Sequence, residues 1–214
     1  MGSPGWKATV KRSGTSTQFT DEAASLVSGK TYQIDDETKQ VWDREQPVTV
    51  KDNGVLVDSS NIEFIDYLFG KVTFTAGYTV TGPVTVSGSY LPMQAVAGAN
   101  AYNLNHTGDL LDDTDFEGAQ ANGGYRTRLY GLRDVSASIT RWDDLSKTFA
   151  DIIKNRSVVV IEIRPGGGPD VFRAFMVAES ANESGDVAAL ESEEISFQLD
   201  GEGVGKAFSW DTES

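Results

Sequence analysis

The sequence predicts a mainly β protein with one α-helix, on three observations. The chain of 214 residues contains 22 glycines and many Thr, Val and Ser residues, a composition that favours strands and turns. Between residues 31 and 90, short β-branched and aromatic runs alternate with turn signals. Only residues 143–156 have the apolar spacing of an amphipathic helix. A chain of this length can form one large domain or two small ones.

The first half of the chain consists of short predicted strands. A strand around Val10 is interrupted at Gly14, and Asp52-Asn53-Gly54 between two β-branched runs predicts a tight hairpin. Pro92 and the small residues at 95–101 indicate a connector. We therefore expect an N-terminal strand or arm at residues 1–22, a β-rich insertion or small β domain at 23–92, and a core at 93–214.

The second half contains the predicted helix. A strand at residues 125–130 is followed by Gly131 and by an alternating strand at 135–139. Asp143 has the residue type and position of an N-cap. The apolar residues that follow at i, i+4, i+7 and i+8 are expected to face the core: Leu145, Phe149, Ile152 and Ile153.

The last predicted strand separates its side chains into two faces. Its apolar residues are Ile195, Phe197 and Leu199. Its polar residues are Glu194, Ser196 and Gln198. Because successive side chains of a strand point to opposite faces, the first set is expected in the core and the second set on a surface.

Three consecutive glycines at residues 166–168 raise the question of a phosphate-binding loop. A P-loop requires a Lys and a helix after the glycines, whereas Pro169 and Asp170 follow here and lead into the strand-like run at 171–177. Residues 158–163 before the glycines are equally strand-like. The glycines are therefore predicted to form the turn of a β-hairpin.

Composition and charge exclude several classes of function. The chain has no cysteine, which rules out disulfides, a thiol nucleophile and a cysteine-based zinc site. A net charge of −14 argues against stable binding to nucleic acid or to anionic lipid, although the usual meaning of such charge is solubility. No apolar run approaches the length of a membrane span.

The search for catalytic and metal-binding residues finds no convincing site. His106 is the only histidine, no G-x-S-x-G motif occurs, and His106 reads as a polar surface residue beside a strand end. The acidic residues that could bind calcium are Asp109, Asp112, Asp113, Asp115 and Glu117. The EF-hand spacing fails at Gly124, where a bidentate Glu is required, so a solvated acidic loop is favoured and calcium stays open. We expect no enzyme activity and no cofactor.

Three sequence segments carry a resemblance to a known family. They are GDLLDDTDFEG at 108–118, YRTRLYGLRDVSASITRWDD at 125–144 and EISFQLDGEG at 194–203. Their order and spacing resemble the major tail tube proteins of long-tailed bacteriophages, over roughly residues 96–214. In that family an acidic segment precedes a Gly-Leu-x-Asp strand, a Trp-Asp pair opens the helix, and a strand ending in Gly completes the core.

The resemblance implies a structural virion protein. Its members form a β-sandwich or barrel flanked by one helix, close into rings of six copies, and stack into a hollow tube that conducts DNA to the host. The implied partners are further copies of the chain and the tape measure, tail tip and tail terminator proteins, with assembly in the host cytoplasm. Many relatives have only a short N-terminal strand, so residues 24–90 would be an insertion.

The charge predicts how such a conduit would treat DNA. Six copies carry 6 × −14 = −84 charges per ring, and any part facing the bore would repel DNA. Glu194, Ser196 and Gln198 are candidate lumen-facing residues, although this face could equally meet outside solvent. Two alternatives stay open: a carbohydrate-binding or adhesion module with Trp42 or Tyr67 as a sugar platform, and a secretion-system tube protein.

Overall fold

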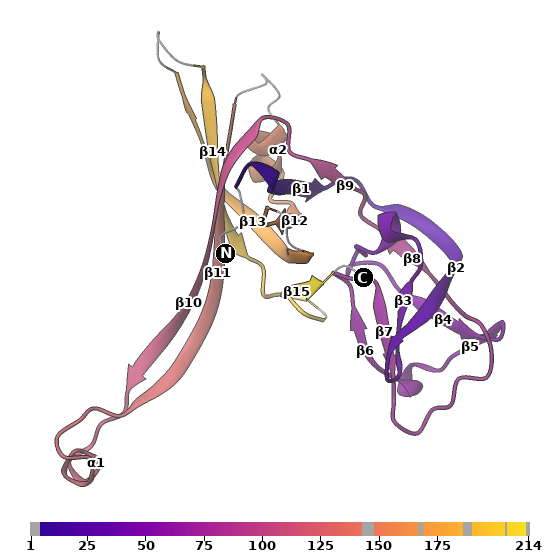
Figure 1. Cartoon of the computed structure of the whole chain (residues 1–214), viewed down its shortest axis with the longest axis horizontal. Helices are drawn as coiled ribbons and strands as arrows, with labels where there is room; N and C mark the ends of the chain where they lie inside the picture. Colours follow the sequence, from indigo (N-terminus) through magenta and orange to yellow (C-terminus); the bar gives the residue numbers. More distant parts are fainter. Residues whose placement is uncertain (1–4, 143–147, 167–168, 186–189, 204, 213–214) are drawn as a thin grey trace.

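The described part of the chain forms two antiparallel β-sheets and two short α-helices (Figure 1). The computed structural model describes residues 5–142, 148–166, 169–185, 190–203 and 205–212. The chain starts in the first sheet, leaves it to build the second sheet, and then returns to complete the first. The mainly β fold class predicted from the sequence is thereby confirmed.

The first sheet has eight strands. They are β1 (Thr9–Ser13), β9 (Met93–Ala95), β10 (Ala99–Asp112), β11 (Arg128–Trp142), β12 (Val158–Arg164), β13 (Asp170–Ser184), β14 (Ser192–Leu199) and β15 (Phe208–Thr212). Their order is β10-β11-β14-β13-β12-β1-β9, and β15 pairs with β13 beside this path. Helix α2 (Thr148–Asn155) lies between β11 and β12 in sequence.

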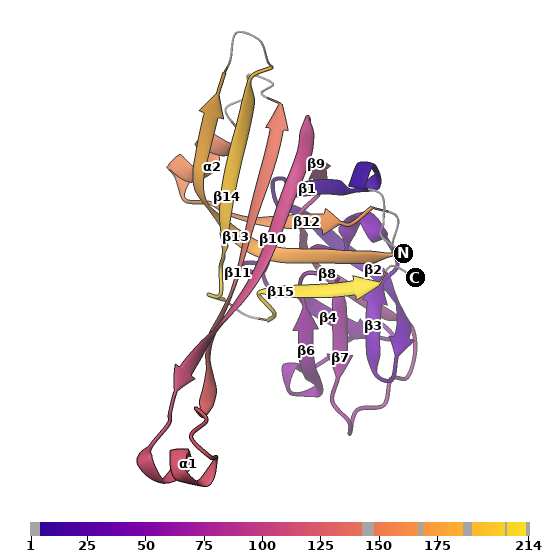
Figure 2. The same cartoon turned by 60° about the vertical axis from the view of Figure 1, so that its left-hand side comes forward.

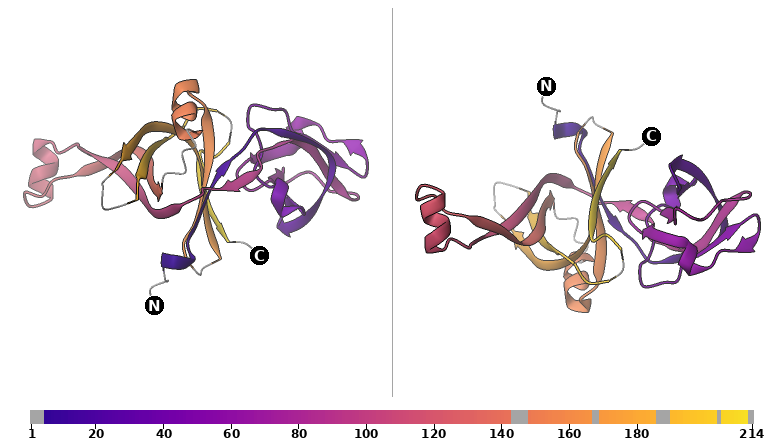
Figure 3. Two further views of the ribbon diagram at one scale, coloured as in Figure 1. Left: turned by 90° about the horizontal axis from the view of Figure 1, so that it is seen from above. Right: turned by 90° about the horizontal axis from the view of Figure 1, so that it is seen from below.

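The second sheet has seven strands and is strongly curled (Figure 3). The strands are β2 (Thr17–Ser28), β3 (Thr31–Ile34), β4 (Thr49–Asp52), β5 (Val55–Leu56), β6 (Ile62–Asp66), β7 (Lys71–Phe74) and β8 (Val84–Tyr90). Their order is β5-β4-β8-β2-β3-β7-β6. Short 3-10 helices lie at Gly5–Lys7, Glu37–Lys39 and Ser59–Asn61. We call residues 17–90 the insert.

The insert interrupts the first sheet between two strands that pair with each other. Ser13 of β1 is opposite Met93 of β9, so the chain returns beside the point where it left. The change of sheet falls between Ser13 and Thr17, ahead of the boundary expected at residue 22, which lies inside β2. Because β1 also pairs with β12, it is an integral strand of its own sheet and is not an arm free to reach another subunit.

Two predicted hairpins are present. The β-hairpin predicted around residues 166–168 forms from β12 and β13, which pair from Val158↔Val177 to Ile163↔Phe172, although residues 167–168 lie outside the described part. The turn predicted at Asp52-Asn53-Gly54 joins β4 to β5. Asn53 and Gly54 have φ values of 51° and 79°, the left-handed geometry that a two-residue hairpin turn requires.

Strand β10 corrects the sequence interpretation of residues 95–117. A connector and an acidic loop were expected, but residues 99–112 form a strand of 14 residues. Its alternate side chains Tyr102, Leu104 and His106 lie opposite core positions of β11, and this long-range pairing outweighs the weak local strand signal. Gly131 was expected to interrupt the next strand, yet β11 runs through it for 15 residues.

Two further elements were not predicted. Helix α1 (Phe116–Ala121) lies at the tip of the β10–β11 hairpin (Figure 2), and Asp115 caps it by accepting a hydrogen bond from the Gly118 N–H. The protein thus has a second, short helix besides the one expected. Strand β15 follows β14, so the strand expected to be the last is the penultimate one.

Helix α2 packs on the core of the first sheet. Phe149 is 1% exposed and contacts the ring of Phe197 edge-on, with ring centroids 6.0 Å apart. Ile152 and Ile153 are partly buried against the same core. Leu145 and the predicted N-cap Asp143 lie outside the described residues.

A buried arginine of the first sheet, held there by an ion pair, joins that sheet to the insert. Arg173 Nε lies 2.7 Å from Glu162 Oε2, and Arg173 Nη1 donates to the Leu68 carbonyl of the insert at 2.9 Å. The Arg173 guanidinium also lies 4.7 Å from the centre of the Phe69 ring. Lys11 Nζ is 2.9 Å from the second Glu162 oxygen.

The protonation of Glu162 follows from this arrangement. Burial by itself raises the pKa of the Glu162 carboxyl, but the positive charges of Arg173 and Lys11 outweigh it and hold this pKa below its usual value. The group is therefore an ionised carboxylate between two cations at neutral pH.

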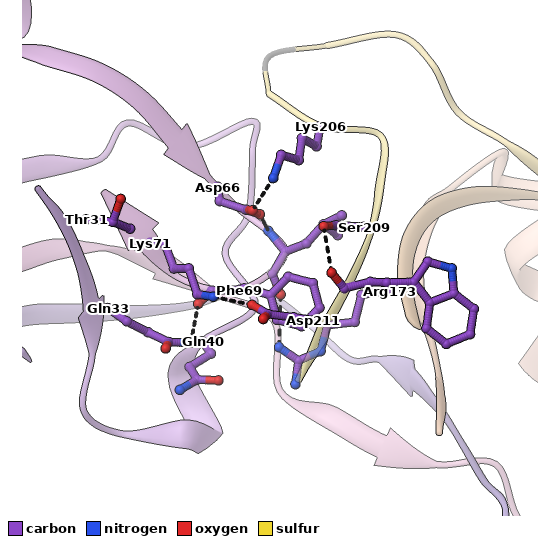
Figure 4. Close-up of polar contacts among 12 residues, drawn as sticks. Thr31, Gln33, Gln40, Asp66, Phe69, Lys71, Arg173, Lys206, Ser209 and Asp211 are labelled. Carbon is purple, nitrogen blue, oxygen red and sulfur yellow. Dashed lines mark hydrogen bonds and ion pairs between the residues drawn. The ribbon is translucent and has the colours of Figure 1, made fainter. Parts of the chain in front are cut away.

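The C-terminal segment adds two ion pairs to this junction (Figure 4). Lys71 of the insert pairs with Asp211 of β15, and Lys206 Nζ lies 3.3 Å from Asp66 at the edge of the insert. The insert core also includes side chains of β12 and β13, namely Val160, Val171 and Phe175. The two sheets therefore pack as one body.

Candidate assembly surface

Four strands of the first sheet form a surface with two different faces. We call β10, β11, β14 and residues 178–184 of β13 the ribbon. Ile139, Ile195 and Phe197 are fully buried on its inner face, where they meet helix α2 and the opposite part of the sheet. Because side chains alternate along a strand, their sequence neighbours point to the outer face.

The outer face of the ribbon is polar. It carries Asn103, Asn105, Ser136, Ser138, Thr140, Glu179, Ser180, Asn182, Glu194, Ser196 and Gln198. We call these residues the polar face. Asn103, Ser138, Ser196 and Ser180 form one continuous cross-strand row. The Gln198 amide donates to Glu179 Oε2 at 2.9 Å. None of these described residues is Lys or Arg.

Both lateral edges of the ribbon lack a strand partner in the described chain. β10 is the end strand of the sheet order, so its outer edge is unpaired. On the other side, β12 pairs with β13 only as far as Val177, and among the described residues no strand pairs with the outer edge of residues 178–184. Unpaired edges of this length are templates for strand addition.

The predicted surface residues of β14 lie in the centre of this surface. Glu194 is exposed and Ser196 and Gln198 are half-buried on the polar face, whereas Ile195 and Phe197 are buried beneath it. The residues that sequence reasoning missed are on β10, namely Asn103 and Asn105. The signal that could have found them is the polar–apolar alternation from residue 101 to 107.

Three residues that were considered as catalytic or calcium-binding candidates make contacts within the fold. His106 lies in the middle of β10 rather than at a strand end, and its ring contacts Phe172 and Phe208 at centroid distances of 5.8 and 5.7 Å. Asp112 accepts hydrogen bonds from the Thr114 N–H and hydroxyl, which hold the pKa of its carboxyl below the usual value. Asp115 caps α1.

Two absences hold for the described residues. No group of three or more His, Asp or Glu side chains within them has an arrangement that could hold a metal ion. None of the helices in the described ranges has the length and hydropathy needed to cross a membrane.

The sugar-platform interpretation is wrong for both residues proposed. Trp42 is 0% exposed and donates its indole N–H to the Lys39 carbonyl, and Tyr67 is 8% exposed beside it. Both rings belong to the core of the insert. Neither can stack on a sugar from solvent.

Two of the solved structures that are similar to this chain come from gene transfer agent particles. A chain from the virion of a native gene transfer agent particle is 18% identical with a TM-score of 0.46, over 56% of this chain and 89% of that one. A chain from the tail of an empty gene transfer agent particle with C6 symmetry is 18% identical with a TM-score of 0.44, over 57% and 87%. No protein-family model and no curated protein matches the chain.

Proposed function

We propose that this protein is the structural subunit of a hollow tail tube, in which six copies close into a ring and stacked rings enclose a channel for DNA. The observation that carries the proposal is the ribbon, whose outer face is polar and carries no Lys or Arg, and whose two edges have no strand partner among the described residues. The sequence resemblance supplies the number of copies and the class of assembly.

Ring closure follows from the strand directions. The ribbon has four strands joined by three antiparallel pairings, so β10 and β13 run in opposite directions. The outer edge of β10 in one copy can therefore pair antiparallel with residues 178–184 of β13 in the next copy. Such a head-to-tail contact closes into a ring when the rotation from one copy to the next fits a whole number of times into a full turn.

The dimensions suit a conduit. Six copies contribute 6 × 4 = 24 strands to a continuous barrel. With neighbouring strands about 4.8 Å apart, the backbone circle is roughly 37 Å across before strand tilt widens it. Barrels of this strand number enclose an open channel rather than a packed core.

The polar face would line this channel. Its Asn, Ser, Thr and Gln side chains hold water, and Glu179 and Glu194 repel phosphates. DNA binds tightly where Lys and Arg release its counterions, and the polar face has neither residue. DNA would therefore slide through the tube without stable binding.

In the proposed tube, this layering would put the insert on the outside of the wall. Below the polar face lies the core that contains Phe149 and Phe197, and beyond it lie β12 and the first half of β13. The opposite side of these two strands contributes Val160 and Phe175 to the insert core. A ribbon that lines the lumen thus leaves the insert as an outer decoration of the wall.

The resemblance extends the proposal to partners and location. The tube would belong to a virion assembled in the host cytoplasm, and would contact tape measure, tail tip and tail terminator proteins. No cofactor and no catalytic step is involved.

Negative-stain microscopy of the purified chain tests the assembly. As the protein concentration rises, we expect rings of six copies, or tubes built from such rings. A chain that stays monomeric at every concentration would contradict the proposal.

A double variant tests the lumen. Glu194→Lys with Gln198→Lys should give tubes that retain DNA in a co-sedimentation assay at low salt and release it at moderate salt. The matched control is Glu45→Lys with Gln46→Lys on the exposed surface of the insert, which adds the same charge. If the control tubes retained as much DNA as the first variant, the polar face would not line the lumen. The same conclusion would follow if tubes of the first variant retained no DNA.

A further inference from the structure

A polar cleft lies where the insert meets the first sheet. Its volume of about 570 Å³ is within the range of pockets that hold small organic ligands. Strands β1, β12 and β13 contribute the side chains that point away from the core under helix α2, and we call this part of the lining the floor. Residues of the insert and of the segment that returns from it form the rest.

The floor of the cleft is basic, although the chain as a whole is acidic. Lys11, Glu162 and Arg173 are opposite one another in the strand registers and form one cross-strand row. Arg164 lies two residues beyond Glu162 and therefore on the same face of β12. The exposed Glu37 is the fifth charged residue of the lining. Cations are thus the majority here, whereas the chain has 18 Lys and Arg against 32 Asp and Glu, so the floor is suited to an anion.

Lys11 is placed to contact a ligand in the cleft. Its side chain is 35% exposed, and its Nζ lies 2.9 Å from the buried Oε1 of Glu162. No hydrogen bond from the described residues reaches that oxygen, so the ion pair does not fix the direction of the ammonium group. Glu162 Oε2 keeps its partner Arg173 at 2.7 Å. The Lys11 ammonium can therefore turn to a bound anion while Glu162 stays paired.

The rest of the lining is suited to an organic group. Tyr90, Pro92 and Met93 border the cleft, and all three are partly exposed. An inorganic ion on the floor would leave these side chains and most of the volume to water. A ligand with an apolar face would cover them, as in pockets that combine an apolar lining with a few charged groups.

We propose that this cleft binds a small phosphate monoester, with the phosphate on Lys11 and Arg164 and the organic group against Tyr90 and Met93. A phosphate monoester carries between about 1.5 and 2 negative charges at neutral pH, which two cations can match. The guanidinium of Arg164 offers the planar fork that binds phosphate oxygens in pairs, and the Lys11 ammonium acts as a point charge. Sugar phosphates and nucleotides share this chemistry. The site goes beyond the structural role proposed above and does not depend on assembly.

Calorimetric titration of the dilute full-length chain tests the ligand class. The two probes are glucose phosphorylated on its primary hydroxyl and adenosine monophosphate, and the reference compounds are inorganic phosphate and glucose. At least one probe should bind about tenfold more tightly than either reference compound, because only the probes engage the floor and the apolar lining together. Tighter binding of the first probe identifies a sugar phosphate, and tighter binding of the second identifies a nucleotide.

Three variants test the place of binding. Lys11→Gln and Arg164→Gln should each weaken binding of the better probe about tenfold, since each removes one charge-assisted contact. Thr9→Tyr keeps every charge and fills the cleft from β1, where Thr9 is exposed and borders it, and should abolish binding. The matched control is Lys51→Gln on the insert, whose side chain is 36% exposed, and its affinity should equal that of the wild type.

Several outcomes would overturn the inference. Inorganic phosphate that binds as tightly as both probes would show a simple anion site, and equal binding of glucose would show that phosphate is not recognised. A probe that binds Thr9→Tyr as tightly as the wild type lies elsewhere on the chain. An equal loss in Lys51→Gln would show that only overall charge matters, and no binding of any probe at millimolar concentration would exclude the site.

The melting temperature of each variant shows whether it is folded. Thr9→Tyr decides the question if a charge variant unfolds, because it leaves the row of Lys11, Glu162 and Arg173 intact. All measurements use dilute subunits, so their failure leaves the proposed tube standing, and a chain that never forms rings leaves the cleft standing.

Discussion

The insert and the outer part of the β10–β11 hairpin, residues 108–133, which we call the arm, both project from the first sheet and differ in how their apolar side chains are covered. The insert closes seven strands around a core in which Trp42 and Phe74 are almost fully buried, and the buried Arg173 of the first sheet donates a hydrogen bond to the Leu68 carbonyl of the insert. The arm has two strands, no core and exposed apolar side chains on both faces. The large apolar side chains of the insert core are therefore covered within the single chain, whereas those of the arm stay exposed.

This difference predicts which side chains stabilise the folded subunit and which side chains stabilise an assembly. Side chains of the insert and of the junction contribute to folding of the single chain, because their contacts are already made within it. Side chains of the arm contribute only when another surface covers them. Substitutions in the first group should alter unfolding, and those in the second should alter assembly.

The largest effect on folding is expected from Phe149→Ala under the ribbon. Phe149 is 1% exposed against Phe197, so its truncation leaves a cavity and should lower the free energy of unfolding by about 3–5 kcal/mol. Urea denaturation measures the loss. An unchanged midpoint would show that α2 is not part of the core that supports the ribbon.

A smaller but pH-dependent effect is expected from Glu162→Gln at the junction. The neutral amide leaves the buried Arg173 without its counter-charge, which should cost roughly 2–3 kcal/mol at neutral pH. The folded-state pKa of Glu162 is lower than its ordinary value of 4.5. Its contribution is therefore fully present above that value and is lost as pH falls through the folded-state pKa.

Unfolding of the two proteins at different pH checks this. The difference in stability between wild type and Glu162→Gln should shrink on acidification below pH 4.5. A difference that stays constant down to about pH 3 would show that ionisation of Glu162 does not stabilise the junction.

Lys206→Ala should have a modest effect on the same junction. The Lys206 side chain is 50% exposed, and its ion pair with Asp66 spans 3.3 Å. Solvent screening limits such a pair to at most about 1 kcal/mol, and added salt should reduce it further. A loss that salt does not reduce would point instead to the contact of the Lys206 ammonium with the Phe64 ring, whose centre lies 5.4 Å from Nζ.

The smallest effect on folding is expected from Phe116→Ala at the tip of the arm. Phe116 is 91% exposed, so the free energy of unfolding should change by no more than about 0.5 kcal/mol. The same variant should raise the concentration at which tubes sediment. If Phe116→Ala assembled normally but had a clearly lower free energy of unfolding, Phe116 would contribute to folding rather than to assembly.

Much of the local structure could be predicted because its signals are local. Asn53-Gly54 specifies a left-handed turn, and the alternation around Ile195 and Phe197 specifies which face of β14 is buried. β10 carries a weaker signal, because its polar–apolar alternation covers only residues 101–107 of a strand of 14 residues. Neither Asn103 nor His106 favours a strand by itself, and pairing with β11 over the whole length decides the outcome.

By itself, the sequence determined the mainly β class, the two tight hairpins, the polar and apolar faces of β14 and the burial of Phe149. These depend on backbone preferences and on side-chain alternation within a few residues. Only the tertiary structure decided that Asn103, Ser138, Ser196 and Ser180 form one row, that Glu162 meets Arg173 and Lys11, and that the arm is bare on both faces. These features join residues far apart in the chain, and pairing between distant strands is set by the packing of the whole sheet rather than by local preference.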